Sequence, residues 1–192
     1  MLNLAYPIDD TVNINGTEYV VDMSFDNILR LFDLIEDKTI RDDFKVNTGL
    51  LMLINDKLED YELQERTDIF IELVKGVIGS DAKESQPVDI DGNPMPVMPS
   101  DDKKAYDLAQ DAEYIYASFM HTYKIDLFEQ QGVLHWKKFK SLLNGLSEDS
   151  VFSRIVGIRT AEPPSGKGTA KERERMQKLK RQYALKENDT EP

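Results

Sequence analysis

Apolar side chains recur every three to four residues along most of this 192-residue chain, and this spacing constrains the fold more than any other feature. Residues at that spacing share one face of an α-helix, so the pattern predicts amphipathic helices packed on a common core. The fold is predicted to be mainly α: a domain of about six helices with a small N-terminal β-hairpin. The expected helices cover residues 24–37, 40–57, 62–78, 103–123, 134–143 and 148–158, with a further one at 170–186.

Ser24 and Ser147 precede two of these stretches and are predicted to cap them, because a serine oxygen can accept a hydrogen bond from a free backbone N–H. Gly49 lies inside the second stretch and weakens that helix prediction. The predicted core consists of the apolar side chains on the inward faces: Phe25, Ile28, Leu29, Leu31, Phe32, Ile35, Phe44, Leu50, Leu51, Leu53, Ile54, Leu58, Ile69, Phe70, Leu73, Val74, Val77, Ala105, Leu108, Ala112, Ile115, Tyr116, Phe119, Trp136, Phe139, Leu142, Leu143, Val151, Phe152, Ile155 and Val156.

The hairpin is predicted from two short apolar runs, residues 12–14 and 19–21, that lie on either side of Asn15 and Gly16. An Asn-Gly pair tolerates the positive φ angles that a tight two-residue turn needs. A lone hairpin is marginally stable in water, so this one is expected to pack on the helices.

Two stretches interrupt the helical pattern and divide the chain. Residues 80–101 contain four prolines and little periodicity, which is typical of a long acidic loop. Residues 162–169 contain two prolines and two glycines, and they are predicted to form a second linker. The predicted organisation is therefore 1–79 as hairpin plus helices, 80–101 as loop, 102–159 as the second helical part of the same domain, and 160–192 as a mobile basic helical tail.

Composition restricts the class of protein. The chain has no cysteine, which excludes a disulfide framework and a thiolate metal site. Its amino terminus lacks a signal-peptide pattern, and the longest apolar run is only residues 49–54, so a soluble, cytoplasmic protein is expected. The net charge is −12, but residues 159–192 hold nine basic and six acidic groups. An acidic body with a weakly basic tail disfavours binding to nucleic acid or to anionic membranes.

Motifs that would indicate catalysis were not found. The chain has no nucleophile elbow, P-loop or dinucleotide-binding sequence. Ser165 is followed by Gly-Lys-Gly, but this segment does not join a strand to a helix as a phosphate loop does. Asp89, Asp91 and Gly92 have a faint resemblance to a calcium loop. Their glycine falls at position 4 instead of 6, and Ser100 takes the place of the bidentate glutamate, so a polar turn is expected.

The two histidines are also predicted to be structural. His121 and His135 stand outside any zinc-ligand spacing. His135 is expected at a helix start or half-buried, and His121 at the surface or the edge of the core. An aromatic group on the 103–123 helix, Tyr114, Tyr116, Phe119 and Tyr123, is predicted to form core and rim. The sequence thus assigns no catalytic, cofactor-binding or metal-binding residue, and a protein that binds partners is expected instead of an enzyme.

The carboxy-terminal half carries a specific pattern: Gly-Val-Leu-His-Trp-Lys-Lys-Phe at 132–139, Leu-Leu-Asn-Gly-Leu at 142–146 and Ile-Val-Gly-Ile-Arg at 155–159. Together with residues 118–120, 123–127 and 149–152, it resembles a small family of proteins from siphophages and prophages of Gram-positive bacteria, named for the fifteenth phage gene product. The resemblance extends over most of the chain, with the loop at 80–101 and the last tail left out.

The resemblance implies a role in phage tail assembly. Members of the family are encoded among tail genes, close upstream of the tape-measure gene, where tail-assembly chaperones are usually encoded. It therefore implies a chaperone in the host cytoplasm that binds the tape-measure protein and recruits tail-tube subunits, and it supplies no catalytic residues to carry over. A helical protein can cover the apolar stripes of a tape-measure protein by packing a helix into a groove. The interface is expected on the 103–123 helix and the basic tail, and a homo-oligomer is compatible with the role.

Three alternatives remain open from the sequence. The protein is a structural tail or head–tail component that stays in the virion, or an enzyme of a type without a sequence signature. A third reading is a nucleic-acid-binding phage protein that uses residues 167–181. Opposite charges alternate in that segment, which makes it a poor phosphate-binding surface.

Overall fold

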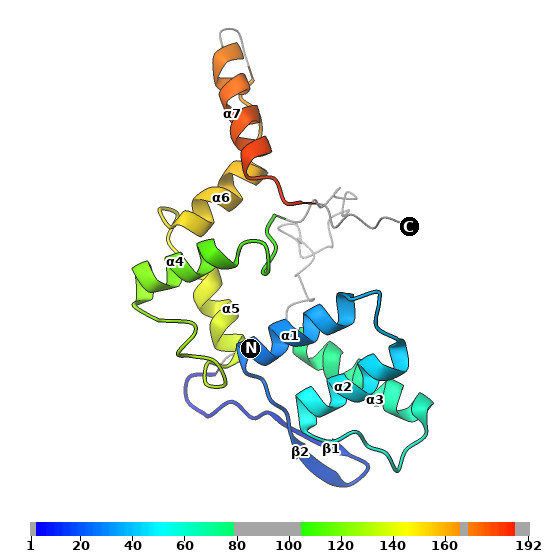
Figure 1. Ribbon diagram of the computed structural model, residues 1–192. Helices are drawn as coiled ribbons and strands as arrows, with labels where there is room; N and C mark the ends of the chain where they lie inside the picture. The colour runs from blue at the N-terminus through cyan, green and yellow to red at the C-terminus, as the bar shows by residue number, and fades with distance from the viewer. Residues whose placement is uncertain (1–2, 79–104, 166–168, 187–192) are drawn as a thin grey trace, which may run out of the picture. The chain divides into compact units, whose positions relative to one another are not determined.

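The computed structural model of the protein describes residues 3–78, 105–165 and 169–186. Within these ranges it contains one two-stranded hairpin and seven helices, so the predicted mainly α fold with an N-terminal hairpin is confirmed (Figure 1). The elements are β1 (Thr11–Ile14), β2 (Thr17–Val20), α1 (Phe25–Glu36), α2 (Asp42–Ile54), α3 (Leu63–Ile78), α4 (Ala112–Tyr123), α5 (Trp136–Asn144), α6 (Val151–Thr160) and α7 (Ala170–Gln182).

The described residues group into two compact units. The first holds residues 3–78 and 131–139, and the second holds 105–130 and the described part of 140–186. Helix α5 therefore begins in the first unit and ends in the second. The expected loop at 80–101, with the calcium-like turn, lies outside the described residues, as do 166–168 and 187–192. The predicted domain boundaries stay a prediction.

The hairpin forms where the Asn-Gly pair predicted it. Asn15 and Gly16 have φ angles of 49° and 92°, the left-handed values that a two-residue turn between twisted strands requires. The side chain of Asn13, two residues before Asn15, accepts the Gly16 N–H at 2.9 Å. Ile14 pairs with Thr17 next to the turn, and its side chain is buried. The hairpin is thereby attached to the first unit through its inward apolar face.

The core of the first unit lies between α1, α2 and α3. Leu31 on α1 and Leu50 on α2 are completely buried, and Phe70 of α3 packs directly over the backbone of Gly49. The glycine that weakened the helix prediction therefore lets α2 and α3 approach closely. Two predicted core residues on α2 were wrong, because they lie on the side of the helix turned to solvent: Phe44 is 58% exposed and Leu51 is 39% exposed.

A segment from far along the chain completes this unit. Ser24 and His135 form an antiparallel β-bridge, in which Phe25 N donates to Leu134 O at 2.9 Å and Trp136 N donates to Met23 O at 2.6 Å. This pairing makes His135 a bridge residue and leaves Leu134 outside the helix. The prediction of a helix start at Leu134 was therefore wrong, and α5 begins at Trp136.

Aromatic rings fill the space behind this bridge. Phe25 stacks on Phe139 at 5.0 Å between centroids, and Phe139 stacks on Trp136 at 5.6 Å. Phe32 meets Trp136 edge-on. Offset and edge-on ring pairs of this kind add stability beyond the area that they bury. The predicted core positions Phe25, Trp136 and Phe139 are confirmed.

In the second unit, the long helix predicted over residues 103–123 is shorter. Helix α4 begins at Ala112, and the described residues before it form turns. The Asp107 carboxylate accepts the N–H groups of Ala109 and Gln110 at 3.0 and 2.9 Å, which satisfies backbone groups in a turn instead of a helix. Ala112 was predicted in the core but is exposed, whereas Phe119 is completely buried as predicted.

Helix α6 is capped by a different serine from the predicted one. Ser150 precedes the helix, and its side-chain oxygen accepts the Ser153 N–H at 3.2 Å. Ser147 lies before this point, and α6 begins three residues later than predicted. Val151, predicted inside, is 46% exposed because it occupies the first turn, while Phe152 and Ile155 are buried. At α1, Ser24 is at the N-cap position, but its hydroxyl donates to Asp22 and makes no cap bond.

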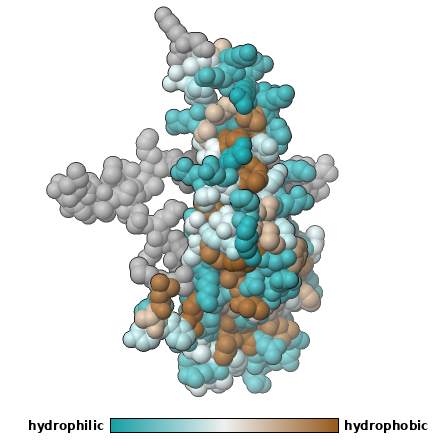
Figure 2. Space-filling view, turned by 90° about the vertical axis from the view of Figure 1, so that its left-hand side faces the viewer, coloured by the Kyte–Doolittle hydropathy of each residue, from teal (hydrophilic) through white to brown (hydrophobic). Residues whose placement is uncertain are grey.

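The tail forms helix α7, as its composition predicted. None of its side chains is buried, and the part of it visible in Figure 2 is mainly hydrophilic. Its end contacts the rest of the second unit through Arg159, which donates to Tyr183 O, and through Gln110, which bonds to the backbone of Lys186. None of the described helices is long and apolar enough to cross a membrane.

Candidate protein-binding cleft

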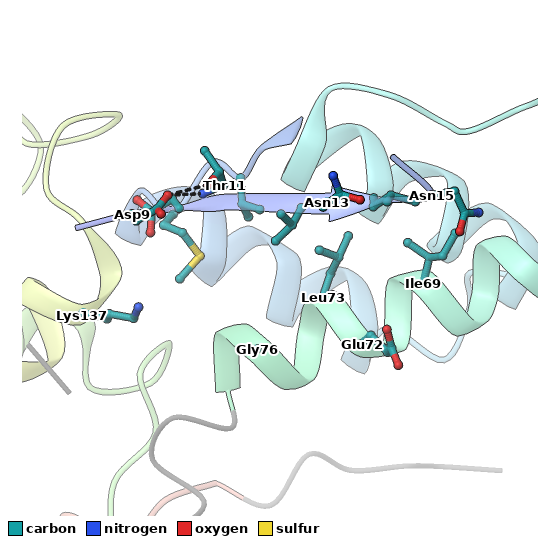
Figure 3. A pocket seen from close by; sticks show the side chains of 14 residues that line it. Asp9, Thr11, Asn13, Asn15, Ile69, Glu72, Leu73, Gly76 and Lys137 are labelled. Carbon is teal, nitrogen blue, oxygen red and sulfur yellow. Dashed lines mark hydrogen bonds between the residues drawn. The ribbon is translucent and has the colours of Figure 1, made fainter. Parts of the chain in front are cut away.

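A cleft of about 520 Å³ lies in the first unit, between strand β1 and helix α3. The strand and the segment before it line one side through six consecutive residues, 9–14. The facing side of α3 contributes four residues, Ile69, Glu72, Leu73 and Gly76, which are labelled in Figure 3. The lining residues are Asp9, Asp10, Thr11, Val12, Asn13, Ile14, Asn15, Val21, Met23, Ile69, Glu72, Leu73, Gly76 and Lys137.

The arrangement follows from the periodicities of its two walls. Alternate strand residues share one face, so Val12 and Ile14 turn together toward α3. Ile69 and Leu73 lie four residues apart and share one face of the helix. Gly76 continues this face one turn later without a side chain, and an added Cβ there would meet no atom within 4 Å. The cleft is therefore apolar along its middle and open at the end near Gly76.

Acidic groups flank the apolar part. Asp9, Asp10 and Glu72 line the cleft together with a single basic residue, Lys137. Asp10 contacts the ring of His135, with Nε2 at 3.0 Å from the carboxylate. Bonds from the Thr11 hydroxyl and the Thr11 N–H lower the pKa of the Asp9 carboxyl below its ordinary value. Asp9 is thus negative throughout the physiological range, and the cleft favours a positively charged ligand.

The histidines lie where the sequence predicted them. His135 is half-buried just before α5, and its Nδ1 accepts the Lys137 N–H at 2.9 Å. Its two ring nitrogens are therefore both used in structural contacts. His121 is exposed on the last turn of α4. Among the residues that the structure describes, no group of three or more His, Asp or Glu side chains is placed to hold a metal ion.

The aromatic group of α4 forms core and rim, as predicted. Phe119 is buried and meets Tyr123 edge-on at 5.6 Å, while Tyr116 lies half-exposed beside Phe128. Partial burial raises the pKa of Tyr116 above its usual value, and the neighbouring Asp126 carboxylate raises it further. The structure leaves the predicted interface on α4 and the basic tail untested.

One buried ion pair in the second unit was missed by sequence reasoning. Arg159 donates to both carboxylate oxygens of Asp111, at 2.6 and 2.7 Å, and also to the carbonyls of Tyr183 and Ala105. The Asp111 hydrogen bonds raise the pKa of Arg159 further above its already high value. Asp111 is only 1% exposed. In a chain with 36 acidic residues, no sequence signal separates this aspartate from the others.

Fold and cleft together define a mainly helical protein with a strand-edged cleft in its first unit. A family model described as Bacteriophage Gp15 protein matches residues 7–185. Because this match covers nearly the whole chain, the chain belongs to the bacteriophage Gp15 family, and the resemblance drawn from its sequence is confirmed. The matched range includes both residues 80–101 and α7, which the resemblance had left out. No curated protein and no solved structure matches the chain.

Proposed function

We propose that this protein is a bacteriophage tail-assembly chaperone that binds the tape-measure protein and recruits tail-tube subunits. The observation that carries the proposal is the membership of the chain in a phage protein family. The position of the family's genes beside the tape-measure gene, which the resemblance implies, then narrows the role from a phage protein to a tail-assembly protein.

The chemistry of the chain is suited to such a role. A tape-measure protein is a long chain whose apolar stripes would aggregate before the tail tube surrounds it. The first unit offers an apolar cleft of about 520 Å³ with acidic flanks, which can hold a segment of another chain. The net charge of −12 would keep the complex in solution by repulsion between its copies. Helix α7, with no buried side chain, leaves a basic surface for a second partner.

Co-expression with the tape-measure protein encoded beside this chain tests the proposal. An affinity tag on the present chain should recover a soluble complex of the two proteins. The matched control is the tape-measure protein expressed alone, which should remain in the insoluble fraction. If the tape-measure protein stays insoluble in both cultures, the chaperone role is wrong.

Mass spectrometry of purified virions separates a chaperone from a structural tail or head–tail component. A chaperone is absent from the finished particle, whereas a structural component is present at a fixed ratio to the tail-tube protein. A nucleic-acid-binding role would instead give binding to duplex DNA at low salt that weakens steeply as salt rises. With an acidic body, we expect no such binding.

A further inference from the structure

Strand β1 has one paired edge and one open edge. In an antiparallel ladder, alternate residues direct both backbone polar groups toward the partner strand. Val21 N donates to Asp10 O, and the pairs Val12 with Tyr19 and Ile14 with Thr17 continue this alternation. The residues between them, at 11 and 13, therefore direct their backbone groups away from β2.

Most of the outward groups on this edge have no partner among the residues that the structure describes. The Thr11 N–H is used by the Asp9 carboxylate. Among the described residues, none bonds to the Asn13 N–H, the Asn13 carbonyl or the Thr11 carbonyl. The Asn13 side chain is occupied separately, as the acceptor of the Gly16 N–H. Three backbone groups are thus available in a row, one donor and two acceptors, on the strand that lines the cleft.

This edge fits an extended segment better than a helix. A helix bonds its own backbone groups internally and has none to offer along its middle. A strand placed about 4.8 Å from β1 offers a full row of donors and acceptors. Its alternate side chains would point the same way as Val12 and Ile14, toward Ile69 and Leu73 of α3. The cleft therefore accommodates a strand with an apolar residue at every second position.

Charge selects among extended segments. Asp9 and Glu72 lie on the two walls of the cleft, one before the strand and one on α3 (Figure 3). A segment with Lys or Arg at its ends complements them, and an acidic segment is repelled. The chain's own residues 80–101 carry five acidic groups and one lysine, so they have the wrong charge for this site.

We propose that the cleft between β1 and α3 binds an extended segment of a partner protein, apolar at alternate positions and basic at its ends, which adds to β1 as a third strand. The inference rests on the proposed function only for the existence of a partner protein. The mode of binding and the chemistry of the bound segment follow from the edge, the apolar walls and the carboxylates.

A synthetic peptide tests the site directly. The probe is the blocked heptapeptide Lys-Val-Thr-Val-Thr-Val-Lys, titrated into the full-length ¹⁵N-labelled chain. The amide signals of the β1 and α3 residues that line the cleft should shift. Hydrogen exchange at the Asn13 amide should slow by about tenfold or more at saturation, because its N–H gains an acceptor. A peptide N-methylated at all five residues between the two lysines, and one with Glu in place of both Lys residues, should each bind about tenfold or more weakly.

Two glycine variants provide the matched comparison. Gly76→Phe places a ring in the cleft where no atom lies within 4 Å of the new Cβ, so the fold should tolerate it. Gly157→Phe adds the same ring at an equally open position of α6 in the second unit. We expect peptide affinity to fall about tenfold or more in the first variant. In the second variant it should stay within about twofold of the parent. Circular dichroism of both variants should match the parent.

Several results would overturn the proposal. One is unchanged exchange at Asn13 during peptide binding, and another is equal loss of affinity in the two variants. Concentration-dependent shifts of the same amides without peptide would show that a second copy of the chain occupies the cleft instead. The peptide experiment uses no tape-measure protein. Its failure therefore rejects strand addition alone, whereas failure of the co-expression experiment rejects the proposed function.

Discussion

The contact between Gly49 and Phe70 makes a quantitative prediction about stability. A Cβ added at Gly49 would lie 2.3 Å from Cε2 and 2.7 Å from Cζ of Phe70. Carbon atoms pack best at about 3.5–4.0 Å, so the ring would have to move by more than about 1 Å. Phe70 is only 8% exposed and has little room to move. Overpacking of this kind costs about 1–3 kcal/mol, and because the ring would have to move by more than about 1 Å, a cost of about 2–3 kcal/mol is expected here.

Alanine also stabilises a helix relative to glycine, by about 1 kcal/mol, and this gain opposes the cost of overpacking. The net expectation for Gly49→Ala is therefore a loss of about 1–2 kcal/mol in the free energy of unfolding, the overpacking cost less the helix gain. For a chain of this length, such a loss lowers the Tm by roughly 2–8 °C.

Trp136 supplies the assay. It is the only tryptophan, it belongs to the first unit, and it is 4% exposed, so its fluorescence reports unfolding of that unit. Urea titrations would be compared for Gly49→Ala and for Gly76→Ala, whose Cβ meets nothing within 4 Å. Gly76→Ala should raise the free energy of unfolding by up to about 1 kcal/mol. The changes in the free energy of unfolding should therefore have opposite signs in the two variants.

A double-mutant cycle identifies the cause. Phe70→Leu removes the ring atoms that would clash with the added Cβ. In that background, Gly49→Ala should lower the free energy of unfolding by less than it does in the parent. If Gly49→Ala is as stable as the parent, or if the cycle shows no coupling, then close packing of α2 on α3 is not the reason for this glycine.

Three further substitutions probe other contacts. Asp111→Ala leaves the Arg159 guanidinium, which is nearly buried, without its carboxylate, and should cost about 3–5 kcal/mol in thermal or urea unfolding; a cost below about 1 kcal/mol would contradict the buried pair. Ser150→Ala removes the cap of α6 and should cost about 1 kcal/mol. Thr11→Val should raise the pKa of the Asp9 carboxyl toward its ordinary value, as followed by carboxyl NMR, because one bond to the carboxylate is lost. Since the folded pKa is lowered, the stability from this contact is present above the unfolded pKa and is lost as the pH falls through the folded value.

The features that the sequence predicted well are local ones. The Asn15-Gly16 turn depends on two residues and their φ angles, so the hairpin could be located from the sequence alone. The helices could likewise be predicted from the spacing of apolar residues along the chain. The family resemblance was also correct, because it relied on spaced motifs in residues 132–159 and the family match includes them.

The features that the sequence could not predict depend on distant contacts. The start of α5 is displaced because residues 134–135 pair with residues 23–24. Serines occur at both 147 and 150, and the local pattern does not distinguish the one that caps α6. The cleft lies between a strand and a helix about 60 residues apart, and its open edge follows from a hydrogen-bond register, so neither is visible as a motif.

The bridge between Ser24 and His135 also sets the order in which the chain can fold during synthesis. The Asp10 carboxylate has no His135 partner until 125 more residues have been synthesised, and Phe25 has no Phe139 partner until 114 more have been added. At ribosomal rates of about 5–20 residues per second, this delay is roughly 6–25 s. During that time the first unit has an incomplete core, and a nascent chain stalled before residue 130 would carry an unfinished aromatic surface that invites aggregation or proteolysis.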